Sequence, residues 1–139
     1  MESLKYRAIR KYPNAEMIYF TMEDIINLKC PIEILQEFEG IRETIGWTTG
    51  VQDINKKESY LGDILKEHIT EWSSKKDKDH AKKCFFIVKK EKDSNNMYLE
   101  YNFNIRGYWE TNNLPINRIE DLEIAGNIFE DEDMIKKEV

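Results

Sequence analysis

Two short segments contain the histidines of this chain, and one of them has the spacing of a known catalytic unit. His68-Ile69-Thr70 matches one half of the site of a two-histidine phosphoesterase. Such a site needs two converging units, in each of which a histidine precedes a Ser or Thr by two positions. The second histidine lies in His80-Ala81-Lys82, which has no hydroxyl at that position. We therefore expect His68 to be a strand residue that faces solvent or a groove, and not a catalytic base.

The cysteines and histidines have none of the local spacings of a metal site. Cys30 and Cys84 are far apart, and the chain has no C-x-x-C and no H-x-x-x-H. Asp77 and Asp79 lie close to His80, but the lysines around them would repel a cation. We predict that the chain holds no metal and that both cysteines are free, with Cys84 in the core.

Other catalytic patterns are absent from the sequence. There is no glycine-rich phosphate loop and no G-x-S-x-G nucleophile motif. Asp and Glu are plentiful, but nothing singles out a pair of them. The sequence therefore predicts no cofactor and no enzymatic activity. An enzyme with an acidic site is the weakest alternative, which a deep cleft with converging carboxylates would favour.

Residues 75–92 form a strongly basic stretch. They contain eight lysines and three acidic residues, a net charge of +5. Lysines on a β-surface with exposed aromatic side chains can bind single strands or phosphates without sequence preference, whereas the absence of arginine argues against bidentate recognition of bases. The candidate nucleic-acid contacts are Lys75, Lys76, Lys78, Lys82 and Lys83, with Trp72, Tyr98 and Tyr108 as neighbouring aromatic residues. The other interpretation is a solvated loop and an edge strand that lysines protect from aggregation.

The glycines in the middle of the chain have a structural explanation. Gly50 and Gly62 flank a polar turn and an aromatic residue. A small bent sheet uses glycine where φ is positive, where a strand bulges, or where a neighbouring strand leaves no room for a Cβ. We expect one of these reasons to apply to both residues, and also to Gly126. Asp63 is expected to accept backbone N–H bonds in its turn rather than to take part in catalysis.

The elements that must position these residues are mainly strands. Strand-forming residues lie on both sides of the turn signal Pro13-Asn14-Ala15, which predicts an N-terminal hairpin. Residues 97–105 alternate apolar and polar side chains over nine positions, so that one apolar face points inward. Further strands are expected at residues 47–51, 60–69, 84–88 and 122–129, with a charged loop at 72–80 and a hairpin turn at 92–96.

One helical unit interrupts the strands. Residues 22–43 have helical periodicity in two parts, and Pro31 is suited to the first turn of the second part. We expect this amphipathic unit to cover a sheet face or edge, with Ile34 and Phe38 as candidate contacts to a protein partner. The predicted fold is thus α+β and mainly β. It is a small, strongly bent antiparallel sheet or an SH3-like barrel, with an N-terminal hairpin and an inserted short helical unit.

Length and charge indicate one soluble domain, residues 1–139. The net charge is −6, and residues 120–139, with eight acidic residues and two lysines, carry all of it. The acidic C-terminal end at about 130–139 is expected to be solvated and to repel nucleic acid. No segment has the apolar length of a signal peptide or a membrane span. We therefore expect a protein that stays in the cytoplasm and does not bind membranes.

Three blocks of sequence resemble the YopX family of phage and prophage proteins, in the order that the family has. The first is the opening Lys5-Tyr6-Arg7-Ala8. The second combines a T-G, a polar turn, K-E, an aromatic residue and G-D-I; the third is an E-x-x-G-N-I-aromatic-E motif at the end. The matching residues of these two blocks are Thr49, Gly50, Asp53, Asn55, Lys57, Glu58, Tyr60, Gly62, Asp63 and Ile64, and then Glu123, Gly126, Asn127, Ile128, Phe129 and Glu130.

The chain also departs from the family pattern. Ile9 and Arg10 stand where an aromatic residue and Asp are common, Lys56 stands where a turn glycine is common, and Glu132 replaces a frequent proline. Residues 21–44 and 72–118 do not match the motifs.

The resemblance implies a phage-borne gene product with a β-rich fold that acts in the bacterial cytoplasm, and it implies no catalytic residue or cofactor. The motif residues that we interpret as structural are Gly50, Asp53, Tyr60, Gly62, Asp63, Gly126 and Asn127. Our hypothesis is a non-enzymatic accessory module that binds a host or phage macromolecule, above all a protein. Its contact surfaces would be the helical unit and the strand edges, and an uncovered edge would also permit a homo-oligomer. The alternative is a nonspecific nucleic-acid-binding protein that uses residues 75–92.

Overall fold

The computed structural model describes residues 5–10, 16–21, 46–81, 83–94 and 96–137. It divides the chain into two compact units, Met1–Thr48 and Thr49–Val139. The predicted helical unit at 22–43, with Ile34 and Phe38, lies outside the described residues, and so do Cys30 and Lys82. The prediction of one domain over the whole chain stays a prediction.

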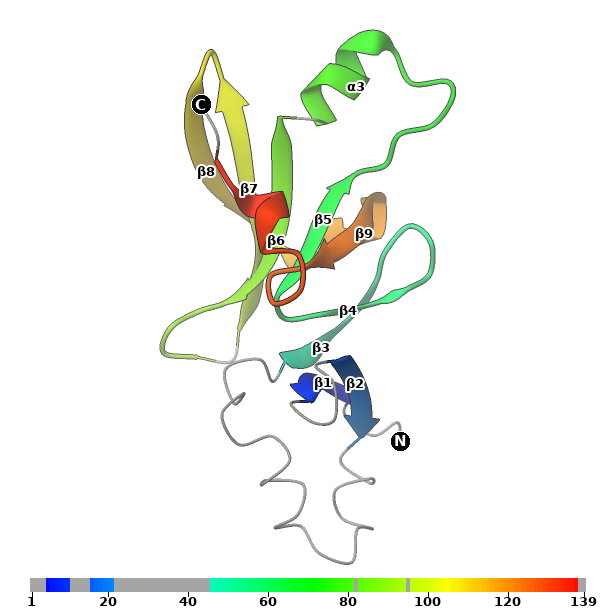
Figure 1. The fold of residues 1–139 in the computed structure, drawn as a ribbon, viewed down its shortest axis with the longest axis vertical. Coiled ribbons are helices and arrows are strands. Elements are labelled where there is room, and N and C mark those ends of the chain that lie inside the picture. Colours follow the sequence, from blue (N-terminus) through cyan, green and yellow to red (C-terminus); the bar gives the residue numbers. More distant parts are fainter. Residues whose placement is uncertain (1–4, 11–15, 22–45, 82, 95, 138–139) are drawn as a thin grey trace, which may run out of the picture. The chain divides into compact units, whose positions relative to one another are not determined.

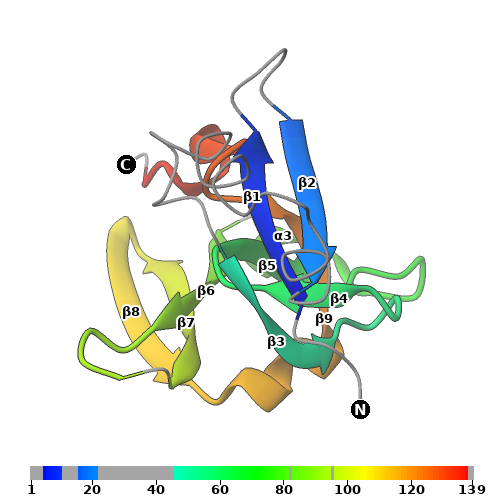
Figure 2. The same cartoon turned by 90° about the horizontal axis from the view of Figure 1, so that it is seen from below.

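The first unit contains the predicted N-terminal hairpin. Strand β1 (Lys5–Arg10) pairs antiparallel with β2 (Glu16–Thr21) over all six positions of each strand, as the blue ribbons of Figure 2 show. Strand β3 (Gly46–Gln52) begins in this unit, where Trp47 lies opposite Tyr6. The expected hairpin is therefore confirmed, and the strand predicted at 47–51 is β3.

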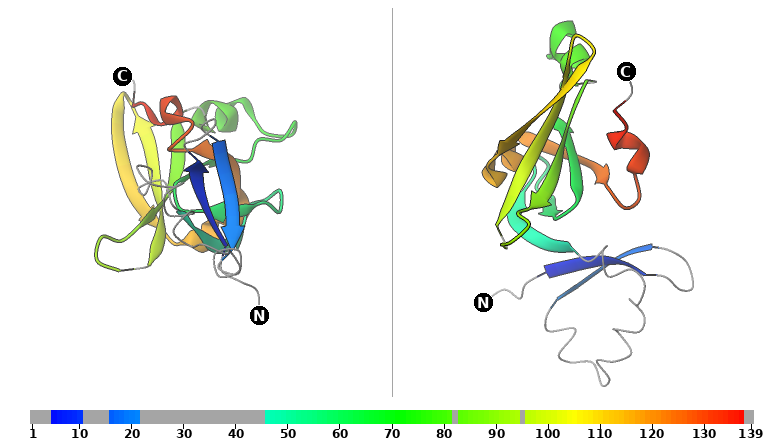
Figure 3. Two further views of the ribbon diagram at one scale, coloured as in Figure 1. Left: turned by 60° about the horizontal axis from the view of Figure 1, so that its bottom comes forward. Right: turned by 90° about the vertical axis from the view of Figure 1, so that its left-hand side faces the viewer.

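The second unit is built on a five-stranded antiparallel sheet with the order β8-β7-β6-β5-β9 (Figure 1). The described strands form an open sheet and no closed barrel, so the bent sheet is the correct one of the two predicted architectures. β7 and β8 form a long twisted hairpin (Figure 3). The bounds are β5 (Asp63–Glu67), β6 (Cys84–Lys90), β7 (Met97–Ile105), β8 (Tyr108–Leu114) and β9 (Leu122–Asn127).

Shorter elements connect these strands, and two of them correct the sequence analysis. The strand predicted at 60–69 is divided, because Tyr60 ends β4 (Glu58–Tyr60) and a turn separates it from β5. The loop predicted at 72–80 contains helix α3 (Lys75–Ala81). The remaining elements are the 3₁₀ helices η2 (Ile116–Asp121) and η3 (Glu132–Ile135).

The start of α3 has a capping box that the sequence analysis overlooked. The backbone N–H of Asp77 donates to the Ser74 hydroxyl over 3.2 Å, and the N–H of Ser74 donates to the Asp77 carboxylate over 3.3 Å. This reciprocal pair satisfies two N–H groups that a helix start leaves without intrahelical partners. The S-x-x-D spacing is a helix-start motif, although the high charge of residues 75–83 is also typical of a solvated loop.

The core has a cluster on each side of the sheet, because β6 is buried along most of its length. Cys84, Phe86 and Val88 belong to one cluster, with Leu65, Leu99, Ile119 and Leu122. Phe85 and Ile87 form the other with Ile64. Consecutive side chains of a strand point to opposite faces, so an unbroken apolar run fits a central strand covered on both sides.

β7 follows the predicted alternation less strictly. Leu99 is fully buried, but Ile105 at the end of the strand is 50% exposed and Asn102 on the other face is fully buried. The Asn102 amide is satisfied there, since its oxygen accepts from the Thr111 hydroxyl over 2.9 Å and its nitrogen donates to Glu100.

The helices in the described part of the chain are all too short or too polar to span a membrane.

Candidate functional site

Three donor side chains from consecutive elements meet at one end of the five-stranded sheet. Glu67 is the last residue of β5, His80 lies in the last turn of α3, and Cys84 is the first residue of β6. The chain leaves the sheet after β5, forms α3 and returns into β6 at the same end (Figure 1). One donor atom of each of the three side chains lies within 4.8 Å of the other two. We call these three residues the donor cluster.

Tyr101 adjoins the donor cluster from β7. His80 Nε2 lies 3.3 Å from Glu67 Oε1 and 2.9 Å from the Tyr101 hydroxyl. The Tyr101 ring stacks on that of Phe86, with centroids 4.6 Å apart, which holds the hydroxyl in place. Burial, followed by the charges of Cys84 and Glu67, raises the pKa of Tyr101 to about 12. Tyr101 therefore remains a neutral hydrogen-bonding group beside the histidine at neutral pH.

The Cys84 thiol is not activated as a nucleophile. It is 6% exposed, and burial together with the charge of Glu67 raises its pKa to about 12. A catalytic cysteine needs the opposite, a lowered pKa in an accessible position beside a positive charge. The proximity of Cys84 to His80 therefore does not amount to a cysteine–histidine catalytic pair. The predicted core position of Cys84 is confirmed.

The donor cluster does not match any metal-site motif in the sequence, because its members are spread over the segment from 67 to 84. The only local signal is the spacing of His80 and Cys84, four positions apart, and it crosses from a helix into a strand. A shallow cavity of about 220 Å³ lies next to the cluster and shares Glu67 with it. The other lining residues are Phe86, Leu114, Arg118, Asp121 and Leu122.

His68 has a different environment from His80. It is exposed after the end of β5, and its Nδ1 lies 3.8 Å from the Glu123 carboxylate on β9. The predicted strand position is thus one residue beyond β5, and the side chain faces solvent as expected.

The Asp53 side chain connects the loop between β3 and β4 to β9 by hydrogen bonds. One carboxylate oxygen accepts from the N–H groups of Asn55 and Lys57, each over 2.9 Å, and the other accepts from the N–H of Ile124 over 3.0 Å. The side chain is 2% exposed. Ionised carboxylates are acceptors only, so three backbone donors suit Asp53 well.

The turn before β5 is shaped by Tyr60, Gly62 and Asp63. The backbone N–H of Tyr60 donates to Asp63 Oδ2 over 2.8 Å, which is the turn bond expected for Asp63. Gly62 has φ +93°, its N–H donates to the carbonyl of Val88, and its own carbonyl accepts from the N–H of Ile128. A Cβ at Gly62 would lie 2.9 Å from a ring carbon of Phe129. Glycine is therefore needed at position 62 both for the positive φ and for the lack of space for a Cβ.

The closing motif is organised by Asn127. Its side-chain oxygen accepts from the N–H groups of Phe129 and Glu130, and its amide nitrogen donates to the Glu130 carboxylate over 2.8 Å. Gly126 has no positive φ; a Cβ there would lie 2.8 Å from Cγ of Asp131, so lack of space explains this glycine. Gly50, by contrast, has φ +78° and open space around it.

Comparison with known proteins shows the family to which these motif residues belong. A family model described as YopX protein matches residues 5–136. The chain belongs to the YopX family. No curated protein matches the chain. The YopX motif residues therefore shape turns and bind backbone groups in this structure, and the donor cluster contains none of the motif residues that carried the resemblance.

Lys56 departs from the YopX pattern at a strained position. Its φ is +66°, a left-handed conformation that costs a side chain about 1 kcal/mol and that glycine adopts freely. We expect Lys56→Gly to raise the free energy of unfolding by about 0.5 kcal/mol, after the entropy that glycine adds to the unfolded chain. Urea denaturation would measure the change. Lys57→Gly is the matched control, because Lys57 is exposed and has no positive φ; it should lose stability, and an equal gain in both variants would contradict the explanation.

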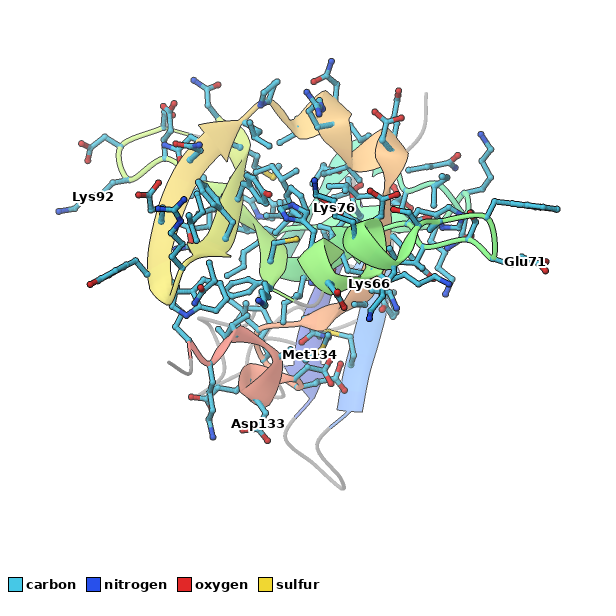
Figure 4. All side chains as sticks on the ribbon, turned by 90° about the horizontal axis from the view of Figure 1, so that it is seen from above. Lys66, Glu71, Lys76, Lys92, Asp133 and Met134 are labelled. Atoms are coloured by element: carbon cyan, nitrogen blue, oxygen red, sulfur yellow. The ribbon has the colours of Figure 1, made fainter. Side chains whose placement is uncertain are left out.

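The structure divides the lysine stretch of this YopX chain into two groups. Lys75, Lys76 and Lys78 lie on α3, whereas Lys89 and Lys90 end β6, a strand about 20 Å long. Figure 4 shows Lys76 on the helix and Lys92 at the far side of the sheet. Lys89 pairs with Glu100 over 2.8 Å, and Lys90 donates to the carbonyls of Glu91 and Ser94. The described lysines of residues 75–92 thus lie in two groups, on α3 and at the end of β6, and nucleic-acid binding stays a prediction.

Proposed function

We propose that this YopX protein is a binding module without catalytic activity, which recognises a protein partner by pairing a strand of that partner with β8. The observation that carries this proposal is the edge position of β8 in the five-stranded sheet, where no other described strand pairs with its outer side. An open edge presents backbone N–H and C=O groups that another chain can bind by β-augmentation.

β8 lacks the features that usually protect an edge strand. Its sequence, Y-W-E-T-N-N-L, has one charged residue and neither Lys nor Pro. It pairs with β7 in an uninterrupted register, from Tyr108 opposite Ile105 to Leu114 opposite Leu99. Natural edge strands are commonly blocked by lysine, proline, bulges or short length. A regular seven-residue edge without these features suits a partner strand.

The turn between β7 and β8 determines which backbone groups point outward. Arg106 and Gly107 form a two-residue turn in which both φ values are positive, so Ile105 and Tyr108 form a hydrogen-bonded pair. Hydrogen-bonded and non-hydrogen-bonded pairs alternate along an antiparallel ladder. In the second half of β8, the N–H and C=O groups that face away from β7 therefore belong to Thr111 and Asn113.

Apolar side chains accompany this edge. Tyr108 at the start of β8 is 76% exposed, and Ile105 before the turn is 50% exposed. Large apolar side chains beside a free edge give a partner strand area to bury as well as backbone groups to bind. The resemblance to phage and prophage proteins supports a partner in the bacterial cytoplasm, from either the host or the phage. A second copy of this chain would use the same edge.

The proposal can be tested with two substitutions of one residue. Asn113→Pro removes an outward N–H, whereas Asn113→Ala removes the same side chain and keeps that N–H. In affinity capture from lysate of the bacterial host, we expect Asn113→Pro to retain at least tenfold less partner than Asn113→Ala. The two variants should have similar free energies of unfolding, since the fold does not use that N–H. Equal recovery by both would exclude β8 as the binding edge.

The same capture experiment distinguishes this proposal from a second candidate function, the binding of single-stranded nucleic acid. Trp72, just before α3, is 92% exposed, and the helix carries three exposed lysines. An exposed indole beside lysines can stack on bases without sequence preference. Nuclease-sensitive capture that ignores Asn113→Pro and is lost on neutralising Lys75, Lys76 and Lys78 together would favour this function.

A further inference from the structure

We propose that the donor cluster of Glu67, His80 and Cys84 is a binding site for a divalent transition-metal cation of the zinc class. Nothing in the motif residues assigns such a site, and it is independent of the proposed binding edge at β8.

The distances in the donor cluster are close to those that a tetrahedral site needs. Metal–ligand distances of about 2.0–2.3 Å place neighbouring ligand atoms about 3.5 Å apart. His80 Nε2 and Glu67 Oε1 are already 3.3 Å apart, and all three donor atoms lie within 4.8 Å of one another. A small adjustment of side-chain torsions would bring the three atoms onto one cation, with a fourth position left for water.

The donor types favour this class of cation. A thiolate, an imidazole and a carboxylate together suit Zn²⁺ and its neighbours Co²⁺ and Ni²⁺, whereas Mg²⁺ and Ca²⁺ prefer oxygen ligands alone. The thiol of Cys84 would release its proton to solvent when the sulfur binds the cation. Three protein ligands with one open position are the coordination of zinc sites that keep a water ligand, whereas structural zinc sites have four protein ligands.

The surroundings supply both a way in and a supporting contact. The side chains of Glu67 and His80 are 32% and 50% exposed, so a hydrated cation can reach them from solvent, while Cys84 forms the buried side of the cluster. The Tyr101 hydroxyl is bonded to His80 Nε2 and to the Cys84 thiol. Because one imidazole nitrogen cannot bind a cation and a hydrogen-bond partner at once, metal binding by Nε2 would release the hydroxyl from His80. The hydroxyl would then orient only the Cys84 sulfur.

The charges around the cluster are mixed, and the nearest one favours a cation. Burial and, as a smaller cause, the carboxylate of Glu67 disfavour a negative charge on the Cys84 sulfur, so the pKa of the thiol is raised. A dication between the two groups would remove that repulsion. The lysines of α3 and Lys83 are exposed, and water and salt screen their charges. The repulsion that argued against a site at Asp77 and Asp79 is thus weaker here.

A bound cation would connect α3 to the sheet. The helix has seven residues, too few for stability without tertiary contacts, and its last turn carries His80. Ligands from β5, α3 and β6 would join both ends of the connecting segment through one ion. The cation would then order the segment between β5 and β6.

The test is titration of chelator-treated full-length protein with Co²⁺, followed by competition with Zn²⁺. We expect a thiolate-to-cobalt charge-transfer band in the near ultraviolet that saturates at one equivalent and that Zn²⁺ abolishes. Cys84→Ser should remove the band. His80→Gln and Glu67→Gln should each weaken binding by at least tenfold, and circular dichroism would verify their fold. His80 and Glu67 are partly exposed, so these variants remain informative if Cys84→Ser does not fold.

The chain supplies its own matched controls, because it contains one other cysteine and one other histidine. Cys30→Ser and His68→Gln should leave the band and the affinity unchanged. Absence of the band in the unmodified protein would overturn the proposal. So would a band that follows Cys30 instead of Cys84, or an affinity that His80→Gln and Glu67→Gln leave unaltered.

Discussion

Asp53→Ala is expected to lower the free energy of unfolding by about 4 kcal/mol. The substitution removes the acceptor of three backbone N–H groups, those of Asn55, Lys57 and Ile124. The Asp53 side chain is 2% exposed, so water cannot easily replace the carboxylate. A buried donor left without an acceptor costs about 1–3 kcal/mol. The three hydrogen bonds of Asp53 are partly buried, and a buried charge is also removed, so the total loss is smaller than three full penalties.

Urea denaturation monitored by tryptophan fluorescence would measure this loss as a lower midpoint with an unchanged slope. Asp53→Asn should lose about half as much, because an amide keeps one acceptor oxygen. Asp133→Ala is the control: its side chain is 88% exposed and pairs with the neighbouring Lys136, so stability should change by less than about 0.5 kcal/mol. A loss at Asp53 no larger than at Asp133 would refute the role assigned to Asp53.

Gly62→Ala is expected to cost about 3 kcal/mol, and Gly50→Ala about 1 kcal/mol. Both residues have positive φ, +93° and +78°, so both substitutions force a side chain into a strained backbone conformation. At Gly50 the new methyl group would meet no atom within 4 Å, but at Gly62 it would lie 2.9 Å from the ring of Phe129. The larger loss at Gly62 is therefore expected from crowding against Phe129.

A double-mutant cycle would verify the cause. Phe129→Leu removes the ring atom nearest to the new methyl group, so Gly62→Ala should cost about 1–2 kcal/mol less in that background. The thermal or urea midpoints of the four proteins give the coupling free energy. If Gly50→Ala costs as much as Gly62→Ala, backbone strain explains both glycines and the contact with Phe129 does not matter.

These variants also bear on where function lies in this YopX protein. Asp53, Gly62 and Asn127 belong to the family motifs, and each binds or accommodates backbone from a turn or a neighbouring strand. We therefore expect their substitutions to act through stability. The open edge of β8 and the donor cluster lie outside the motif residues, and we expect substitutions there to change binding with the fold intact.

Local sequence signals predicted most strands correctly because they depend on neighbouring residues. The turn at 13–15, the apolar run at 84–88 and the alternation at 97–105 correspond to the β1–β2 hairpin, β6 and β7. Two elements were missed although signals existed: the capping box of Ser74 and Asp77, and β8 after the Arg106-Gly107 turn. The hydroxyl and carboxyl groups of a capping box act within four residues, so the sequence of residues 74–77 contains the signal for this helix start.

The sequence by itself determined the strand-rich architecture and part of the turns of this chain, since φ preferences, side-chain alternation and short-range hydrogen bonds operate within a few residues. Only the tertiary structure decided that Asp53 would bind Ile124, 71 positions later, that the lysine stretch would be divided, and that Glu67, His80 and Cys84 would meet. Their proximity depends on the pairing of β5 with β6 and on the return of the chain through α3. Pairing between distant strands arises from the burial of the whole core, which no local pattern of residues encodes.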